Sequence, residues 1–174
     1  MSRLRTEFPL VNGHPDVAGV LRDPDLLRLV STELTDPFRD QGVTVVMAPE
    51  ARGPILGAMV AIELGAGLVL ARKNERNHPG ADIPVTSSPT WRGTREVFLG
   101  RSFDLTPSDR VLVVDDWITT GSTLRAVGNI VRLLGAAYVG ASVLVNKAPP
   151  QTIKELQAHT VVDFDDLMTN ERRN

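Results

Sequence analysis

The sequence contains no cysteine, no long apolar run and no basic cluster. The absence of cysteine excludes disulfides, thiolate nucleophiles and cysteine-ligated zinc sites. No apolar run approaches the roughly 20 residues that a membrane-spanning helix needs. Residues 1–16 also lack the apolar core of a signal peptide. We therefore expect a cytoplasmic protein with no membrane partner.

A strong excess of charge of one sign is missing as well. The chain has 19 Lys and Arg residues against 21 Asp and Glu residues, which gives a formal net charge of −2. Such a balance provides no general attraction to nucleic acid, so we expect no nucleic-acid partner. The three histidines, His14, His78 and His159, lie far apart in the sequence and show no metal-ligand spacing.

What the sequence does contain is an architectural unit that occurs twice. Each copy has an aliphatic strand, a polar loop, an apolar or amphipathic helix and a second strand. The strands are expected at 43–48, 68–72, 111–114 and 138–145, and the helices are expected to end near Gly65 and Gly135. Continuous aliphatic strands that alternate with helices indicate an α/β fold, a parallel twisted sheet flanked by helices. A length of 174 residues suits a single domain, 1–174.

The segments around these units complete the expected organisation. Residues 23–42 predict an amphipathic helix that Asp23 caps and in which Pro24 occupies the first turn. Residues 74–93 are rich in Pro, Gly, Asn, Ser and Thr, and so long an irregular segment predicts a mobile flap. Residues 94–100 predict a strand returning from the flap, and residues 159–168 predict a last edge strand.

The stretch VLVVDDWITTGST, residues 111–123, places two adjacent carboxylates after four aliphatic residues. Ligands of open α/β sheets bind beyond the carboxyl ends of the strands. The T-T-G-S-T run meets the start of a helix, where unpaired N–H groups suit a phosphate. Asp115 and Asp116 offer acceptors for hydroxyl groups one step earlier. A ribose 5-phosphate carries both a phosphate and hydroxyls, so it fits this pattern.

This stretch resembles the phosphoribosyl pyrophosphate (PRPP) signature of the type I phosphoribosyltransferases. Residues 48–73, APEARGPILGAMVAIELGAGLVLARK, are similar to the preceding region of adenine and xanthine phosphoribosyltransferases. The likeness extends more weakly from about Asp23 to Lys147, whereas a Walker G-x-x-x-x-G-K motif is absent. The resemblance implies a homodimeric enzyme of purine salvage that converts PRPP and a nucleobase into a nucleoside 5′-monophosphate and pyrophosphate. It also implies a base-binding hood made by residues 1–22 and 146–168.

The resemblance implies a role for each matching residue. Asp115 and Asp116 would engage the ribose hydroxyls, directly or through Mg²⁺ that is bound with PRPP. The 5′-phosphate would be held by Thr119, Thr120, Gly121, Ser122 and Thr123. The pyrophosphate loop would consist of Glu50, Ala51, Arg52 and Gly53, with a cis peptide at Glu50–Ala51. Arg52 and Lys73 would contact the leaving pyrophosphate, so the expected catalytic residues are Asp115, Asp116, Arg52 and Lys73.

The identity of the base depends on a different set of residues. Adenine-specific members of the family carry Glu-Tyr-Gly in the flap, whereas this chain has WRG at 91–93, so no general acid is assigned. Lys147 matches a lysine of xanthine- and guanine-type members that contacts the 6-oxo group. An ammonium only donates hydrogen bonds and therefore complements a carbonyl oxygen. We accordingly expect a 6-oxopurine rather than adenine. The alternative is that Lys147 is an ordinary solvated residue with no contact to the base. Trp91 and Trp117 either stack on the base or pack beside the loops.

Two other functions share some of these features. A PRPP-sensing regulator keeps the fold without catalysis, but such proteins commonly carry an added DNA-binding segment or a basic RNA-binding face, and neither is visible in the sequence. A phospho-acceptor signalling module also uses clustered aspartates at strand ends. Its acid pair lies near the N-terminus, whereas Asp115 and Asp116 lie two-thirds along this chain. A phosphoribosyltransferase remains the leading interpretation.

Overall fold

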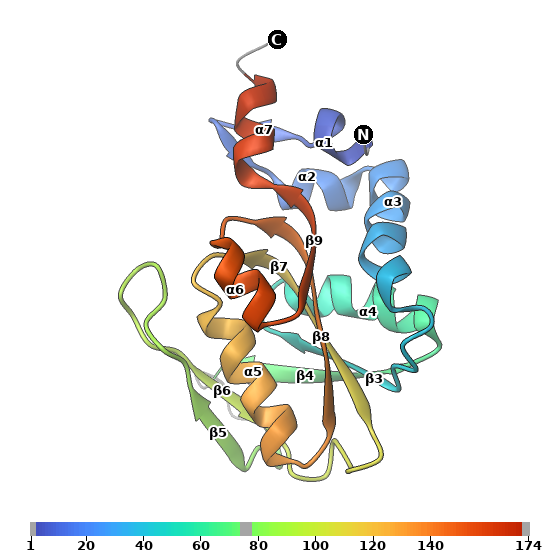
Figure 1. Cartoon of the computed structure of the whole chain (residues 1–174), viewed down its shortest axis with the longest axis vertical. Helices are drawn as coiled ribbons and strands as arrows, with labels where there is room; N and C mark the ends of the chain where they lie inside the picture. Colours follow the sequence, from blue (N-terminus) through green and yellow to red (C-terminus); the bar gives the residue numbers. More distant parts are fainter. Residues whose placement is uncertain (1–2, 74–77, 172–174) are drawn as a thin grey trace.

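A computed structural model describes residues 3–73 and 78–171 of the chain. It contains a seven-stranded sheet in the order β5-β6-β4-β3-β7-β8-β9 (Figure 1). The strands of this sheet are β3 Val45–Pro49, β4 Gly67–Lys73, β5 Ile83–Thr86, β6 Val97–Gly100, β7 Arg110–Ile118, β8 Ala137–Asn146 and β9 Ala158–Asp163. The five strands from β4 to β9 in this order are parallel, and β6 and β5 add an antiparallel edge.

The two expected units form the centre of the sheet because their strands are aliphatic on both faces. In β7, Leu112 and Val114 belong to one core cluster, whereas Val111 and Val113 belong to the other. All four side chains are fully buried. A strand of this kind needs a layer of helices on each face. The predicted α/β fold is therefore confirmed.

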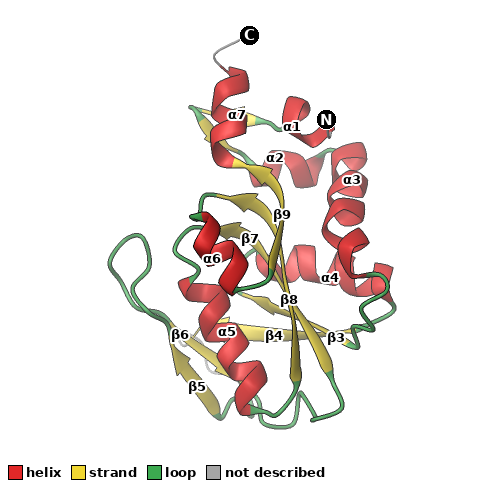
Figure 2. Cartoon of the chain, in the orientation of Figure 1, coloured by secondary structure: helices red, strands yellow, loops and turns green. Residues whose placement is uncertain are grey.

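Helices cover both faces of the sheet (Figure 2). One face is covered by α3, Pro24–Thr35, and α4, Gly53–Leu64, which contact each other and strands β3, β7, β8 and β9. The other face is covered by α5, Ser122–Leu133, which contacts β7 and β8 and also the β5–β6 edge. Because α4 begins just after β3 has ended and α5 just after β7 has ended, the loops at this edge of the sheet converge.

The N-terminal elements and helix α7 lie side by side beyond this edge (Figure 1). The N-terminal elements are α1 Arg3–Glu7, β1 Leu10–Val11, β2 His14–Pro15 and α2 Val17–Arg22. The C-terminal helices are α6 Pro150–Glu155 and α7 Phe164–Glu171. Helix α1 packs against α7, and Arg5 Nη1 lies 3.4 Å from Asp166 Oδ2. The segments expected to form a base-binding hood are thus neighbours in space.

Three expected boundaries are wrong. The helix predicted over 23–42 ends at Thr35 and is followed by a 3₁₀ turn, Asp36–Phe38, because Pro37 cannot continue an α-helix. The strand predicted over 111–114 continues to Ile118, since its last residues still pair with β8. The edge strand predicted over 159–168 ends at Asp163, where α7 begins.

The segment expected as an irregular flap, 74–93, is more regular than its composition indicates. It contains β5, which pairs with β6, and the strand predicted over 94–100 begins only at Val97. Residues 74–77 lie outside the described part. Residues 90–94 form a turn at the loop between β5 and β6. The mobility of this segment stays a prediction.

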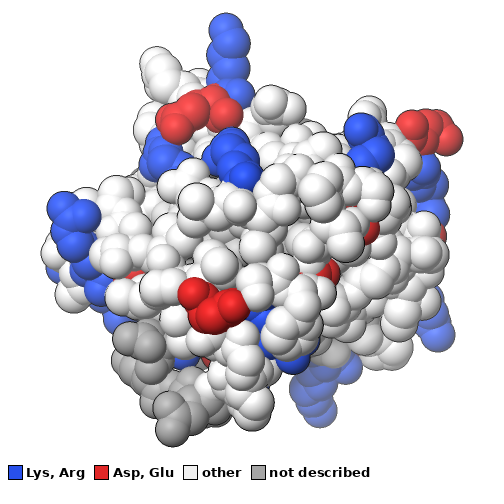
Figure 3. Space-filling view, turned by 90° about the horizontal axis from the view of Figure 1, so that it is seen from below, with Lys and Arg blue, Asp and Glu red and all other residues white. Residues whose placement is uncertain are grey.

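Charges of both signs are scattered over the face seen in Figure 3, and Lys and Arg do not merge there into one continuous basic surface. None of the helices in the ranges 3–73 and 78–171 combines the length and the apolar character that crossing a bilayer requires.

Candidate active site

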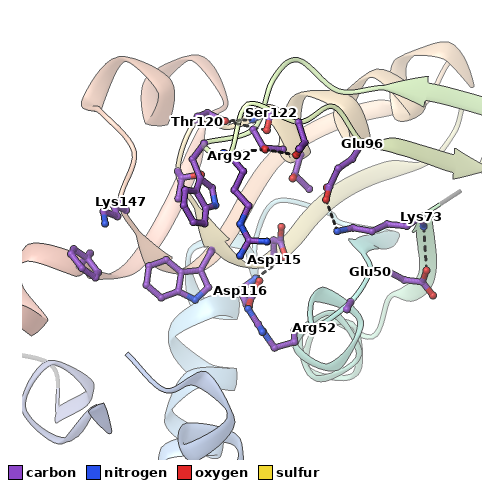
Figure 4. A pocket seen from close by; sticks show the side chains of 18 of the residues that line it. Glu50, Arg52, Lys73, Arg92, Glu96, Asp115, Asp116, Thr120, Ser122 and Lys147 are labelled. Carbon is purple, nitrogen blue, oxygen red and sulfur yellow. Dashed lines mark hydrogen bonds and ion pairs between the residues drawn. The ribbon is translucent and has the colours of Figure 1, made fainter. Parts of the chain in front are cut away.

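A pocket of about 780 Å³ opens at the carboxyl ends of the parallel strands, a size typical of small-molecule sites (Figure 4). The predicted site residues that line it are Glu50, Ala51, Arg52, Lys73, Asp115, Asp116, Thr119, Thr120, Ser122, Thr123 and Lys147. Gly53 and Gly121 are buried behind the lining. The structure therefore brings together residues that are separated by up to 97 positions in sequence.

The acid pair lies near the end of β7, and both carboxylates are buried. The Asp116 N–H donates a hydrogen bond of 2.8 Å to Asp115 Oδ1. Burial, reinforced by the neighbouring charge of Asp116, raises the pKa of Asp115 well above its usual range. Ionising Asp115 next to Asp116 therefore lowers the stability of the fold. A ligand that donates hydrogen bonds to the pair or brings positive charge would offset this loss.

Arg52 reaches the pair from the loop between β3 and α4. Its Nε atom forms an ion pair with Asp116 Oδ2 (Figure 4). The Arg52 side chain is 57% exposed, so it remains open to an incoming anion. The Glu50–Ala51 peptide bond just before it is cis, as the resemblance implied. Gly53 follows because a Cβ there would lie 3.2 Å from Asp115 Oδ1 and 3.2 Å from Val114 O.

Lys73 stands at the end of β4, one strand away from Arg52. Its Nζ atom lies 2.8 Å from Glu96 Oε1, and its backbone N–H donates to Glu50 Oε2 at 3.2 Å. The other carboxylate oxygen of Glu50 lies 2.9 Å from Arg72 Nε. Arg72 Nε has no hydrogen-bond partner among the described residues, so its contact with Glu50 is an ion pair whose geometry does not align a hydrogen bond. Glu50 therefore ties the loop to β4 through both of its carboxylate oxygens.

The T-T-G-S-T run forms the turn between β7 and α5. Thr120 Oγ1 donates to Ser122 Oγ at 3.0 Å and accepts the Ser122 N–H at 3.3 Å. Arg125 Nη1 donates to the Thr120 carbonyl at 2.7 Å and thereby fixes the turn from behind. The first turn of α5 carries no acidic residue, so its partial positive charge is not neutralised. This arrangement suits a phosphate group.

The far end of the pocket is aromatic. Trp117 and Phe164 have ring centroids 6.0 Å apart, and Lys147 Nζ lies 4.0 Å from the Phe164 centroid. Lys147 is held at the end of β8 by its N–H, which donates to the Ile118 carbonyl at 2.8 Å. His14 lines the pocket from the N-terminal segment. Flat rings and one ammonium make this end suitable for a planar heterocycle.

Several lining residues were missed from sequence alone: His14, Thr90, Arg92, Thr94, Glu96 and Phe164. Trp91 and Trp117 were left open and also line the pocket. Arg92 carried a weak signal, since it lies in the W-R-G triplet that replaces Glu-Tyr-Gly. The others carried none, because an isolated Thr, Glu or Phe is as common on an ordinary surface as in a site.

Metal binding by the protein alone is limited. Within 3–73 and 78–171 there is no group of three or more His, Cys, Asp or Glu side chains arranged to hold an ion. The acid pair supplies two carboxylates, and Mg²⁺ commonly combines one or two carboxylates with substrate phosphates. The residues present therefore fit a metal ion that arrives with a phosphorylated substrate.

Comparison with known proteins gives an independent view of this pocket. Residues 20–170 match the family model described as phosphoribosyl transferase domain. The chain is 37% identical over 131 residues to an adenine phosphoribosyltransferase of Klebsiella pneumoniae, covering 75% of this chain and 70% of that one. It is likewise 37% identical over 130 residues to that of Streptomyces clavuligerus, covering 75% of this chain and 71% of that one.

A solved structure agrees with these relatives. The crystal structure of adenine phosphoribosyltransferase from Rhodothermus marinus superposes with a TM-score of 0.75 at 35% identity, covering 86% of this chain and 85% of that chain. The family model spans nearly the whole described chain, including both strand–loop–helix units and every pocket-lining residue except His14. The chain therefore belongs to the phosphoribosyl transferase domain family.

Proposed function

We propose that the protein transfers the 5-phosphoribosyl group of PRPP to a purine base and releases pyrophosphate. One observation carries the proposal: the acid pair, the T-T-G-S-T turn and the cations Arg52 and Lys73 line a single pocket. The turn would hold the 5′-phosphate, Asp115 and Asp116 would hold the ribose hydroxyls, and the two cations would face the diphosphate. The names of the relatives support a purine base.

The chemistry of this transfer suits the residue types in the pocket. Displacing pyrophosphate from C1 of the sugar builds positive charge on the ring and negative charge on the leaving oxygens. Such a reaction needs positioned charge and exclusion of water more than a nucleophilic side chain. Arg52 would stabilise the leaving group, and Lys73 would do so after exchanging its contact with Glu96 for the diphosphate. Mg²⁺ bound between the acid pair and PRPP would neutralise charge on the diphosphate.

For the base we propose the aromatic end of the pocket, between Trp117 and Phe164. Lys147 favours a 6-oxopurine, because an ammonium matches a carbonyl oxygen and opposes the 6-amino group of adenine. A site built on one such hydrogen bond rejects the mismatched base strongly. The second candidate is adenine, which the names of the relatives favour.

The test is turnover with PRPP, Mg²⁺ and a panel of adenine, hypoxanthine, guanine and xanthine, with release of pyrophosphate as the signal. We expect higher kcat/KM for a 6-oxopurine, and a loss of that preference in Lys147→Ala. Lys154→Ala, on α6 and outside the pocket lining, is the matched control and should keep the wild-type ranking. A wild-type preference for adenine would assign the second candidate.

The same experiment separates catalysis from PRPP sensing. Asp115→Asn combined with Asp116→Asn should abolish turnover without loss of the fold, since both replacements keep the shape of the side chains. A wild type that binds PRPP but turns over none of the four bases would favour the regulator. Full activity in the double variant would refute the assignment of the PRPP site.

We also propose that the protein is a homodimer. Helix α4 is apolar except for Glu63 near its end, whereas a surface helix of a monomer normally has one polar face. Its inner side chains are buried in the core, but Ile55 is 50% exposed and Ile62 is 81% exposed. These two residues lie two turns apart on one stripe of the helix. A second copy of the chain is the partner that would cover this stripe.

A further inference from the structure

We propose that Arg92 is a substrate-binding residue that binds the diphosphate of PRPP from the side opposite Arg52. The proposal deepens the proposed function and rests on it. Arg92 comes from the loop between β5 and β6, in the W-R-G triplet that stands where adenine-specific members of the family carry Glu-Tyr-Gly. The position therefore carries a cation where the pattern has a neutral side chain.

The turn that carries Arg92 is well fixed by its own hydrogen bonds. The Thr90 N–H donates to the Thr94 carbonyl at 2.8 Å, and the Gly93 N–H donates to the Thr90 carbonyl at 2.9 Å. The Thr90 and Thr94 hydroxyls lie 3.0 Å apart, and the Arg92 N–H donates to Thr90 Oγ1 at 3.3 Å. Gly93 closes the turn with a φ of +75°. The backbone at Arg92 is thus fixed locally by residues 90–94.

The side chain points into the pocket toward Asp115 and Asp116 (Figure 4). Its Cζ atom lies 4.8 Å from the ring centroid of Trp91, so the indole supports the guanidinium along its length. In the same view Arg52 reaches the acid pair from the α4 side and Arg92 from the side of the β5–β6 loop. Two guanidiniums from separate elements therefore flank one pair of carboxylates.

Arg92 differs from the two other cations near the proposed diphosphate position, Arg52 and Lys73, in that both of these already form ion pairs. Arg52 is paired with Asp116, and Lys73 is paired with Glu96. The Arg92 guanidinium forms no ion pair with any residue in the described ranges 3–73 and 78–171. An uncommitted guanidinium in a pocket for a phosphorylated ligand is available at once. Binding an anion there breaks no ion pair among the described residues.

The charge of the ligand gives this cation its function. The pocket lining has four carboxylates, Glu50, Glu96, Asp115 and Asp116, and four cations, Arg52, Lys73, Arg92 and Lys147. A diphosphate adds several negative charges close to the acid pair. The planar fork of Arg matches two phosphate oxygens at once, which a lysine at the same place does not do. Arg92 would offset the repulsion between the diphosphate and the carboxylates.

The experiment compares Arg92→Gln with Arg95→Gln. Arg95 lies on the same loop, but its Nη1 atom donates to the Ser87 carbonyl at 3.3 Å and it does not line the pocket. We expect Arg92→Gln to raise the KM for PRPP and the Kd for pyrophosphate by about 10- to 100-fold, as for loss of a hydrogen bond to a charged group. The KM for the base should change less than 3-fold, and Arg95→Gln should match the wild type. Arg92→Lys should recover only part of the affinity.

Calorimetric binding of pyrophosphate with Mg²⁺ needs no turnover, so it tests Arg92 independently of catalysis. If the wild type binds pyrophosphate but transfers no base, the proposed function fails while a weakened Arg92→Gln still supports this inference. Wild-type affinity for both PRPP and pyrophosphate in a folded Arg92→Gln protein would overturn it. A wild type that binds neither ligand would overturn both proposals. An equal loss in Arg95→Gln would instead assign the effect to the loop as a whole.

Discussion

At the scale of single residues, the pocket is organised around an unfavourable pair of charges. Asp115 and Asp116 share the end of a buried strand, and Asp115 accepts a hydrogen bond from the backbone of its neighbour. Burial and the adjacent carboxylate both disfavour the charged form of Asp115. Such a pair lowers the stability of the empty protein, and a bound ligand with hydroxyls and a metal ion would offset that loss.

The first prediction follows from the sign of this effect. An acid whose pKa is raised on folding stabilises the fold only while it is protonated. The stability that Asp115 contributes is therefore fully present below pH 3.8, its ordinary pKa, and is lost as the pH rises from there through the raised pKa of the folded protein. Asp115→Asn keeps the shape and the Oδ1 acceptor but cannot ionise. We expect its Tm at pH 8 to exceed that of the wild type by about 2 to 4 °C, which corresponds to roughly 1 kcal/mol.

The measurement is thermal unfolding of both proteins, without ligand, from pH 4 to pH 8. The difference in Tm should shrink toward pH 4, because Asp115 is then protonated in the wild type. Other carboxylates, such as Asp109, have a lowered pKa and change stability in the opposite direction, but they are common to both proteins and cancel in the difference. A difference that is constant with pH would contradict the raised pKa.

At the scale of elements, the turn between β7 and α5, which is the proposed phosphate site, packs against α6. Gly121 adopts a φ of +75° at the start of α5. A Cβ atom there would lie 2.7 Å from Thr152 Cγ2 and 2.8 Å from Leu156 Cδ1. The glycine thus serves two purposes, since it permits the left-handed backbone and lets α6 pack directly against the turn.

We therefore predict that Gly121→Ala destabilises the fold by about 2 kcal/mol and raises the KM for PRPP. For a chain of this size the loss corresponds to a fall in Tm of about 4 to 8 °C. Gly65→Ala is the matched control: its φ is +64°, but a Cβ there would meet nothing within 4 Å. It should show the backbone cost alone and an unchanged KM. Equal effects of the two substitutions would argue against tight packing of α6 on the turn.

At the scale of the whole molecule, the exposed apolar side chains on the outer face of α4 favour a dimer over a monomer. Helix α4 follows directly on the loop that carries Arg52, so its packing also positions that residue. Ile62 is 81% exposed, which is costly for an aliphatic side chain in a monomer and inexpensive in a dimer interface. The expected homodimer would bury it.

The corresponding prediction is that the wild type sediments as a dimer and that Ile62→Asp shifts it to the monomer, since a buried unpaired carboxylate opposes association. Leu133→Asp is the matched control, because Leu133 is 67% exposed at the end of α5 on the other face of the sheet. It should leave the sedimentation coefficient unchanged. A monomeric wild type, or a dimeric Ile62→Asp protein, would contradict the proposed interface.

The parts that the sequence determined by itself are local. The strands of the two βα units, the helices that follow them and the acid pair with its T-T-G-S-T turn all come from short stretches whose periodicity or composition depends on neighbours along the chain. The pocket-lining residues Glu50, Ala51, Arg52, Lys73 and Lys147 came instead from the family resemblance, since none of them stands out by periodicity or composition. The 74–93 segment was less predictable, because β5 forms only by pairing with β6.

The tertiary structure decided which distant side chains face the acid pair. The contacts of Lys73 with Glu96, the approach of Arg92 and the place of Phe164 beside Lys147 depend on the order of strands in the sheet and on how the loops fold over its edge. The end of α7 meets α1 for the same reason. Contacts of this kind leave no periodic trace in the sequence, since a single Arg, Glu or Phe satisfies the local structure equally well in solvent.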